Sequence, residues 1–295
     1  MTTPGIEGRV AAEAVADRDR AERIRRARAR RGPRFLRLYT VAVIAYLFVP
    51  IGVMILFGFN DLKGRYNLIW QGFTLRHYQE VFKFTALTSA LRNSLIVAAV
   101  TTVVATALGT LVALALTRYR FRGRGATNLF IFVPMATPEI VLGVSLLTLF
   151  VSIQVPRGLG TILIAHIMFT ISFVVVTVKA RTQGFNREWE EAAKDLGATP
   201  WVTFWTVTFP LIFPGVLAAA ALAAALSVDD YVVTSFNAGQ TSTFPLWVFG
   251  ASRIGVPPQV NVMGTIIFMV GVALALLTVV LQRRQEGAAP PPVSS

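Results

Sequence analysis

SLIVAAVTTVVATALGTLVALALT, residues Ser94–Thr117, is the stretch of sequence that decides the fold class. It carries no charged residue and exceeds the roughly 20 apolar residues that an α-helix needs to cross a bilayer. It lacks the strict alternation of a membrane barrel strand and is too long to be one. The stretch therefore predicts a transmembrane α-helix.

Five other stretches have the same character. They are Tyr39–Phe59, Ala126–Ile153, Leu159–Val178, Val207–Val228 and Val260–Leu281. Among all six, only Ala126–Ile153 holds a formal charge, Glu139, about midway along it. The sequence thus predicts an all-α integral membrane protein with six transmembrane helices over residues 39–283. We expect a basic cytoplasmic tail at residues 1–38 and a disordered cytoplasmic tail at residues 284–295.

The charge balance supports a membrane location and predicts an orientation. The chain has 28 basic and 15 acidic residues, and its mean hydropathy is +0.61. A soluble protein so basic would suggest nucleic acid, but here the basic residues lie between long uncharged stretches, which indicates membrane lipids. With the N-terminus inside, 21 basic residues fall in inner segments and 7 in outer ones. We therefore predict that both termini are cytoplasmic.

Several kinds of chemistry lack the residues they need. The chain has no cysteine, and its two histidines, His77 and His166, lie far apart, so we expect no metal site. A P-loop needs Gly-Lys-Ser or Gly-Lys-Thr, and none of the four lysines follows a glycine. No convergent set of nucleophile and base is visible. We expect neither an enzyme nor a bound cofactor.

The segment before the fifth stretch reads NREWEEAAKDLGATPWVTFWTVTFP, residues Asn186–Pro210. Asn186 is a good N-cap, and Glu190 and Lys194 have the spacing of an ion pair on a helix. Gly197 suits the left-handed position that ends a helix, and Thr199 before a proline suits the start of another. We therefore predict two short helices that meet at a tight glycine turn on the cytoplasmic side.

This segment resembles the Glu-Ala-Ala loop of binding-protein-dependent ABC importer permeases. That pattern is Glu-Ala-Ala, three residues, Gly, nine residues, then Ile-x-Leu-Pro. The chain has every spacing, with valine and phenylalanine at the two apolar positions before the proline; the matching residues are Glu191, Ala192, Ala193, Gly197 and Pro210. The resemblance implies the type I ABC importer permease fold in a bacterial inner membrane. It also implies that these residues couple the chain to an ATPase.

The same resemblance implies a set of partners. They are a second permease subunit, an ABC ATPase dimer that binds ATP and Mg, and an extracytoplasmic substrate-binding protein. Further segments resemble the second permease subunit of spermidine/putrescine transporters, over roughly residues 35–283. These segments are Phe59–Asp61, Trp70–Tyr78, Leu91–Leu95, Ser227–Val233 and Phe244–Phe249. Permeases for aminophosphonates, opines or ferric iron share much of this pattern and remain alternatives.

Four residues are candidates for the route of a cationic substrate: Glu139, Asp229, Asp230 and Tyr231. A carboxylate within a membrane is costly unless it faces protein or water, and an aromatic ring face attracts an ammonium group. The alternative is structural, with Glu139 hydrogen-bonded to another helix and the aspartates as local caps. We expect His166 to be packed and hydrogen-bonded. In a rival secondary transporter, Glu139 would instead couple an ion gradient to transport.

Overall fold

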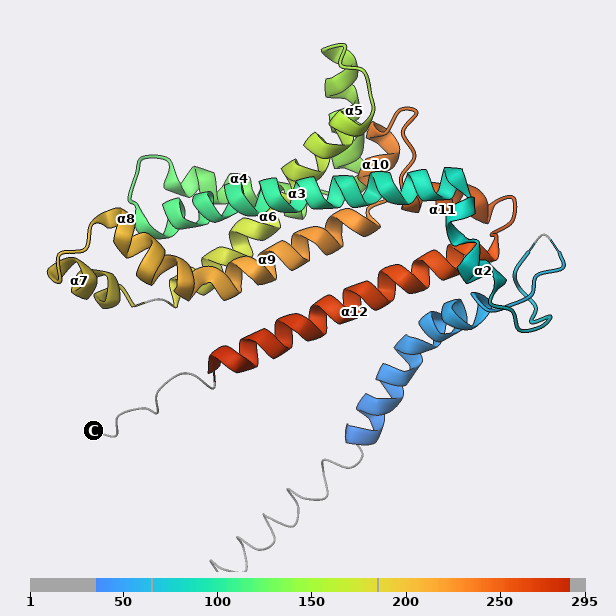
Figure 1. The fold of residues 1–295 in the computed structure, drawn as a ribbon. Helices are drawn as coiled ribbons and strands as arrows, with labels where there is room; N and C mark the ends of the chain where they lie inside the picture. Colours follow the sequence, from blue (N-terminus) through green and yellow to red (C-terminus); the bar gives the residue numbers. More distant parts are fainter. Residues whose placement is uncertain (1–35, 65, 185, 287–295) are drawn as a thin grey trace, which may run out of the picture. The chain divides into compact units, whose positions relative to one another are not determined.

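The computed structural model describes residues 36–64, 66–184 and 186–286 (Figure 1). It divides into two units, Met1–Phe57 and Gly58–Ser295, each of which is described by itself. The first unit contains the helix Leu36–Phe57, which is long and apolar enough to cross a membrane. Residues 1–35 of the predicted basic tail and 287–295 of the predicted C-terminal tail lie outside the described residues.

The second unit is helical, as predicted, and its described residues form no β-strand, only one isolated bridge between Asn60 and Phe73. Its elements are α2 (Arg76–Gln79), η1 (Val81–Lys83), α3 (Thr85–Arg118), α4 (Arg124–Ala136), α5 (Glu139–Ser152), α6 (Leu159–Gln183), α7 (Glu188–Asp195), α8 (Pro200–Thr203), η2 (Phe204–Thr208), α9 (Phe209–Asp229), α10 (Val232–Asn237), α11 (Phe244–Ser252) and α12 (Pro258–Glu286).

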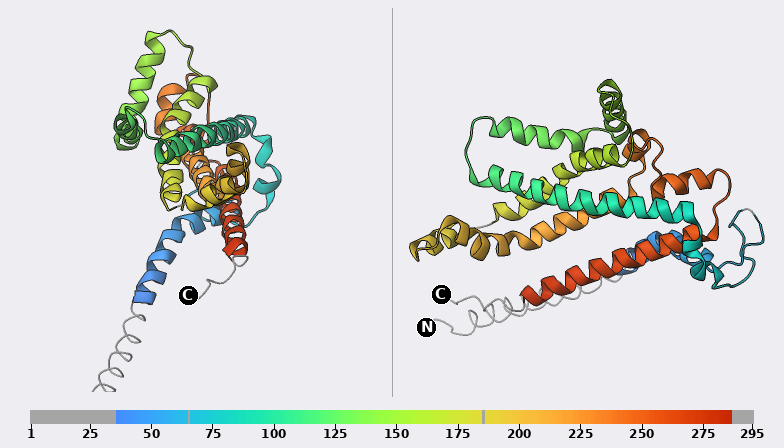
Figure 2. Two further views of the ribbon diagram at one scale, coloured as in Figure 1. Left: turned by 90° about the vertical axis from the view of Figure 1, so that its left-hand side faces the viewer. Right: turned by 45° about the horizontal axis from the view of Figure 1, so that its top comes forward.

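Helices α3, α6 and α9 pack side by side and form the centre of this unit (Figures 1 and 2). Their shared core consists of small and β-branched residues together with one leucine: Ala105, Ala113, Leu116, Val174, Val175, Val178, Ala219 and Ala223. Small residues let helices approach closely in a membrane. At Gly109 α3 lies close against α6, because a Cβ there would lie 2.6 Å from the side chain of Val174.

The third predicted helix is not continuous, and the prediction of one helix over Ala126–Ile153 was wrong. The chain breaks between α4 and α5, whose axes differ by 106°. Pro138 causes the break because it disfavours helical geometry at the residue before it, and Thr137 is extended. Glu139 therefore lies exposed in the first turn of α5, rather than midway along a helix.

The fifth predicted helix begins earlier than expected. A single helical run extends over Pro200–Asp229 through α8, η2 and α9, so the second short helix and the membrane helix are continuous. The segment η2 is a π-helix in which the amide of Phe209 bonds the carbonyl of Phe204. Pro210 has no amide hydrogen to continue the α-helical ladder, so the wider turn precedes it.

The number of membrane-crossing helices is close to the predicted six. In the described part of the chain, four helices are long and apolar enough to cross a membrane, or five if α4 and α5 form one span. The sixth predicted stretch lies in α12, which is apolar over Pro258–Ala273. Its first turns pack against η1 and the start of α3 through Val260, Met263 and Leu87.

Candidate functional site

Helix α7 carries the Glu-Ala-Ala residues and lies at one end of the second unit, beside α8 (Figure 1). Glu191 and Ala192 are exposed, and Ala193 is half-buried. Trp189 and Leu196 are 60% and 90% exposed, and with Ala192 they have the spacing of one helical face. One face of α7 is thus apolar and uncovered within this chain.

The turn after α7 has the geometry that the sequence predicted. Gly197 has a φ of +85°, in the left-handed region. Its amide bonds the carbonyl of Lys194 at 2.8 Å, and the amide of Ala198 bonds the carbonyl of Ala193 at 3.0 Å. These two bonds form a Schellman motif, which closes the end of α7. The hydroxyl of Thr199 then caps the next helix by accepting from the amide of Val202 at 3.4 Å.

The opposite face of α7 contacts the bundle through polar side chains. Glu190 forms an ion pair with Arg118, the last residue of α3, and accepts a hydrogen bond from the hydroxyl of Thr208 in η2. The expected pair of Glu190 with Lys194 is thus replaced by a contact with α3. Arg187 donates from its guanidinium to the carbonyl oxygen of Thr117 at 3.0 Å. Two arginines therefore connect α7 with the end of α3.

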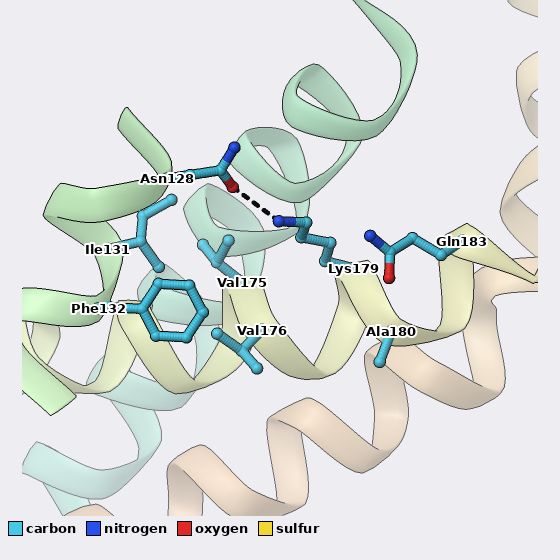
Figure 3. Close-up of a pocket in the computed structure, with 8 residues that line it drawn as sticks. All are labelled: Asn128, Ile131, Phe132, Val175, Val176, Lys179, Ala180 and Gln183. Atoms are coloured by element: carbon cyan, nitrogen blue, oxygen red, sulfur yellow. Dashed lines mark hydrogen bonds between the residues drawn. The ribbon is translucent and has the colours of Figure 1, made fainter. Parts of the chain in front are cut away.

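A small cavity lies between α4 and α6, near the end of α6 that leads towards α7 (Figure 3). Its volume is about 180 Å³, and its lining is mainly apolar, with Ile131, Phe132 and Val176 among the lining residues. At its polar side the ammonium of Lys179 donates to the amide oxygen of Asn128 at 2.7 Å. None of the predicted pathway residues lines this cavity.

The two aspartates at the far end of α9 have different surroundings. Asp229 is the last residue of α9 and is exposed. The side chain of Asp230 is only 6% exposed and accepts from the amide and the hydroxyl of Thr234, at 2.8 and 2.7 Å. It also accepts from the amide of Val233 at 3.3 Å. Asp230 is therefore a cap for α10, whereas Asp229 is available to other groups.

His166 lies at the centre of a buried polar cluster on α6, α9 and α10. One ring nitrogen, Nδ1, is 2.8 Å from the hydroxyl of Ser227, and Nε2 is 2.8 Å from the hydroxyl of Thr234. Nε2 is also 3.2 Å from a carboxylate oxygen of Asp230. Burial raises the pKa of Asp230, but hydrogen bonds from His166 and Thr234 outweigh it and hold that pKa below its usual value. The packed, hydrogen-bonded His166 expected from the sequence is confirmed.

Tyr231 and Glu139 are placed on separate elements near α10. The ring of Tyr231 packs on that of Phe249, with centroids 4.5 Å apart, and the guanidinium of Arg253 lies 4.8 Å from the same Phe249 ring. Glu139 lies on α5, which packs against α10. A Cβ at Gly143, one turn after Glu139, would lie 2.7 Å from the ring of Phe236.

Sequence reasoning missed the residues that connect these candidates to the rest of the chain. Arg118, Arg187 and Thr208 link α7 to the bundle, and Ser227 and Thr234 complete the cluster around His166. A spacing of four residues links Asp230 with Thr234. No local pattern pairs Arg118 with Glu190, or Ser227 with His166, because the partners lie far apart along the chain. In the described ranges no three His, Cys, Asp or Glu side chains gather as a metal site would require.

Comparison with known proteins gives both close relatives and a shared fold. The chain is 38% identical over 254 residues to the spermidine/putrescine transport system permease protein PotC of Haemophilus influenzae, covering 85% of this chain and 98% of that protein. It is 35% identical over 230 residues to the putrescine transport system permease protein PotI of Escherichia coli, covering 75% and 81%.

A chain in the crystal structure of a bacterial alginate ABC transporter, in complex with an alginate pentasaccharide-bound periplasmic protein, has the same fold. The TM-score is 0.59 at 15% identity, with 85% of this chain and 94% of that chain covered. The fold is therefore that of a type I ABC importer permease. Residues 105–288 also match the family described as the binding-protein-dependent transport system inner membrane component. The chain belongs to this family of membrane permease subunits of ABC importers.

Proposed function

We propose that this chain is a permease subunit of an ATP-driven importer of polyamines such as spermidine and putrescine. The observation that carries this proposal is the similarity, at 38% identity, to nearly the full length of a relative named for that transport. The chain would form half of the translocation path with a second permease subunit. An extracytoplasmic binding protein would deliver the polyamine.

The exposed carboxylates support a cationic substrate and a path at the surface of this chain. Asp229 and Glu139 are both exposed. An uncompensated carboxylate facing lipid is costly, so each must face water or another protein within the membrane. A path between this chain and the second permease meets that condition. In this arrangement Asp229 contacts the polyamine directly, while Asp230 holds α10 and Tyr231 in place.

Helix α7 is the element that we propose to dock on the ATPase. Its uncovered face, Trp189, Ala192 and Leu196, is apolar and beside the carboxylate of Glu191. Amphipathic helices of this kind bind in apolar grooves of partner proteins. Gly197 and Pro210 determine the geometry of the connection between α7 and the helical run that enters the bundle. ATP and Mg would then bind to the separate ATPase, whose closure moves α7.

The proposed orientation follows from the basic residues. The chain lies in the inner membrane of a bacterial cell. Both termini and α7 face the cytoplasm, and Asp229 faces outward. In this orientation the α7 face is accessible to a cytoplasmic ATPase, and the segment after α9 is accessible to a binding protein. The same orientation places the loop at Arg122 inside and the loop at Ser242 outside.

Substrate identity is tested by uptake in proteoliposomes that contain the complete complex and its binding protein. Labelled spermidine and putrescine are compared with an aminophosphonate, an opine and ferric iron. We expect accumulation of the polyamines alone. Accumulation of one of the other ligands without polyamine uptake would assign the chain to that substrate instead.

A further inference from the structure

We propose that Glu190 is a positioning residue that locks helix α7 to α3 and to the start of α9, so that these elements move as one lever. The proposal rests on the proposed function, in which α7 receives the motion of the ATPase. It adds a transmission route that the chain connectivity does not provide. The polar cluster that forms this route is Arg118, Arg187, Glu190 and Thr208.

Chain connectivity joins α7 only to α6, on one side, and to α8 and η2, on the other. Helix α3 ends at Arg118, about seventy residues earlier in the sequence, and has no covalent link to α7. Any direct transmission from α7 to α3 must therefore pass through side chains. The described contacts that can do so are those of Arg118 and Arg187.

The two arginine contacts run in opposite directions. Arg118 extends from α3 to the carboxylate of Glu190. Arg187, just before α7, extends back to the carbonyl oxygens of Thr117 and Arg118, at 3.0 and 3.5 Å. These carbonyls belong to the last turn of α3, where helix carbonyls lack partners and the helix dipole favours a cation. A displacement of α7 away from α3 thus strains both contacts.

Glu190 extends the connection to a third element. It accepts from the hydroxyl of Thr208, a buried residue of the π-helical segment that begins the α9 run. The side chains of Glu190 and Arg118 are only 13% and 23% exposed, so water competes weakly for their charges. A shielded, charge-assisted contact holds its geometry better than an exposed pair. Glu190 is therefore the shared acceptor that fixes α7, α3 and η2 relative to one another.

The test replaces Glu190 with glutamine and Arg118 with methionine, singly and together, in the complete complex in proteoliposomes. Uptake and ATP hydrolysis are measured side by side, and the ratio of substrate transported to ATP hydrolysed is the readout. Each single variant should lower this ratio roughly fivefold or more, the usual lower range of coupling between sites. The double variant should be no worse than either single one, because all three remove the same contact.

The matched control is Glu80→Gln, which breaks the ion pairs of Glu80 with Arg76 and Lys83. The two basic side chains are 72% and 73% exposed, so the loss of these pairs should leave the ratio unchanged. A milder variant, Thr208→Val, removes one donor to Glu190 and a long contact from Arg118 at 3.5 Å, and it keeps the ion pair. It covers the case in which Glu190→Gln fails to assemble. It should lower the ratio while the amount of assembled complex stays the same.

Three outcomes would overturn the proposal. One is an unchanged ratio in Glu190→Gln, and another is additive effects of the two single changes. The third is that Glu190→Gln loses uptake and hydrolysis only in proportion to its loss of assembled complex, while Thr208→Val is unaffected. That result would mean that the cluster is merely structural. The wild-type complex distinguishes failure of this proposal from failure of the proposed function. A wild-type complex that does not couple ATP hydrolysis to uptake contradicts the proposed function itself.

Discussion

Replacing Gly197 with valine tests whether the turn between α7 and the bundle is needed for coupling. A φ of +85° costs a side chain with a Cβ about 1–2 kcal/mol, and a β-branched side chain is among the least tolerant. No atom lies within 4 Å of a Cβ at this position, so the whole cost is conformational. If the turn relaxes instead, the two Schellman hydrogen bonds are lost, at about 1 kcal/mol each.

Either response destabilises the docked orientation of α7 by about 1–2 kcal/mol. The equilibrium constant between the docked and other orientations of α7 then changes roughly five- to thirtyfold. We expect uptake per ATP hydrolysed to fall severalfold in Gly197→Val, while membrane insertion and complex assembly stay normal. The assay is uptake and ATP hydrolysis in proteoliposomes, with ATPase binding measured by co-purification.

Gly184→Val is the matched control at the other side of α7. Gly184 has a φ of −85°, and a Cβ there would approach only the carbonyl oxygen of Arg181, at 3.9 Å. This backbone conformation does not require glycine, so valine avoids the left-handed strain expected at Gly197, and coupling should stay at the wild-type level. If Gly197→Val transports as well as Gly184→Val and binds the ATPase normally, the turn has no role in coupling.

Three further predictions concern topology, charge and packing. A cysteine at Ser242 should react with an impermeant thiol reagent only from the outside, and labelling only from the cytoplasm would reverse the orientation. Asp229→Asn should lower polyamine uptake severalfold more than uptake of a neutral analogue, and it should leave the unfolding temperature unchanged. Asp230→Asn should also lower the unfolding temperature, because it loses charge-assisted hydrogen bonds. Equal effects of the two variants on the unfolding temperature would refute the distinction. Gly109→Val should destabilise the bundle by about 1–3 kcal/mol in thermal unfolding, and Val174→Ala should partly restore it, since the two side chains would otherwise overlap.

The hydrophobic stretches predicted the fold class because a bilayer imposes a length and an uncharged composition that can be recognised locally. The stretch Leu159–Val178 became the body of α6, which begins at the predicted residue. The turn of the Glu-Ala-Ala loop was also readable, since the caps at Gly197 and Thr199 act over a few residues. The predicted N-cap Asn186 was wrong, because Arg187 holds that position before α7. These predictions succeeded because their causes lie within one or two turns of chain.

The errors have physical causes that hydropathy does not report. Pro138 interrupts the third stretch without changing its apolar character, so the break and the new position of Glu139 were missed. The π-helical segment before Pro210 joined two elements that were predicted to be separate. A check of each apolar stretch for internal prolines would have indicated the first of these.

The polar clusters were beyond sequence reasoning because their members come from distant parts of the chain. Glu190 had a plausible local partner in Lys194, yet the structure pairs it with Arg118, which arrives through the packing of α3 against α6 and α9. Likewise, the division of roles between Asp229 and Asp230 depends on His166 and on the position of α10. Burial and approach angle decide these contacts, and both follow from the tertiary structure.

The central claim is that this chain transports polyamine with energy from a partner ATPase. It is tested most directly by spermidine uptake into proteoliposomes of the complete complex, with ATP supplied on the ATPase side and all ion gradients collapsed. The account predicts uptake under these conditions, and none when the ATPase carries an inactivating substitution. Uptake that needs an ion gradient and continues without ATP would contradict it.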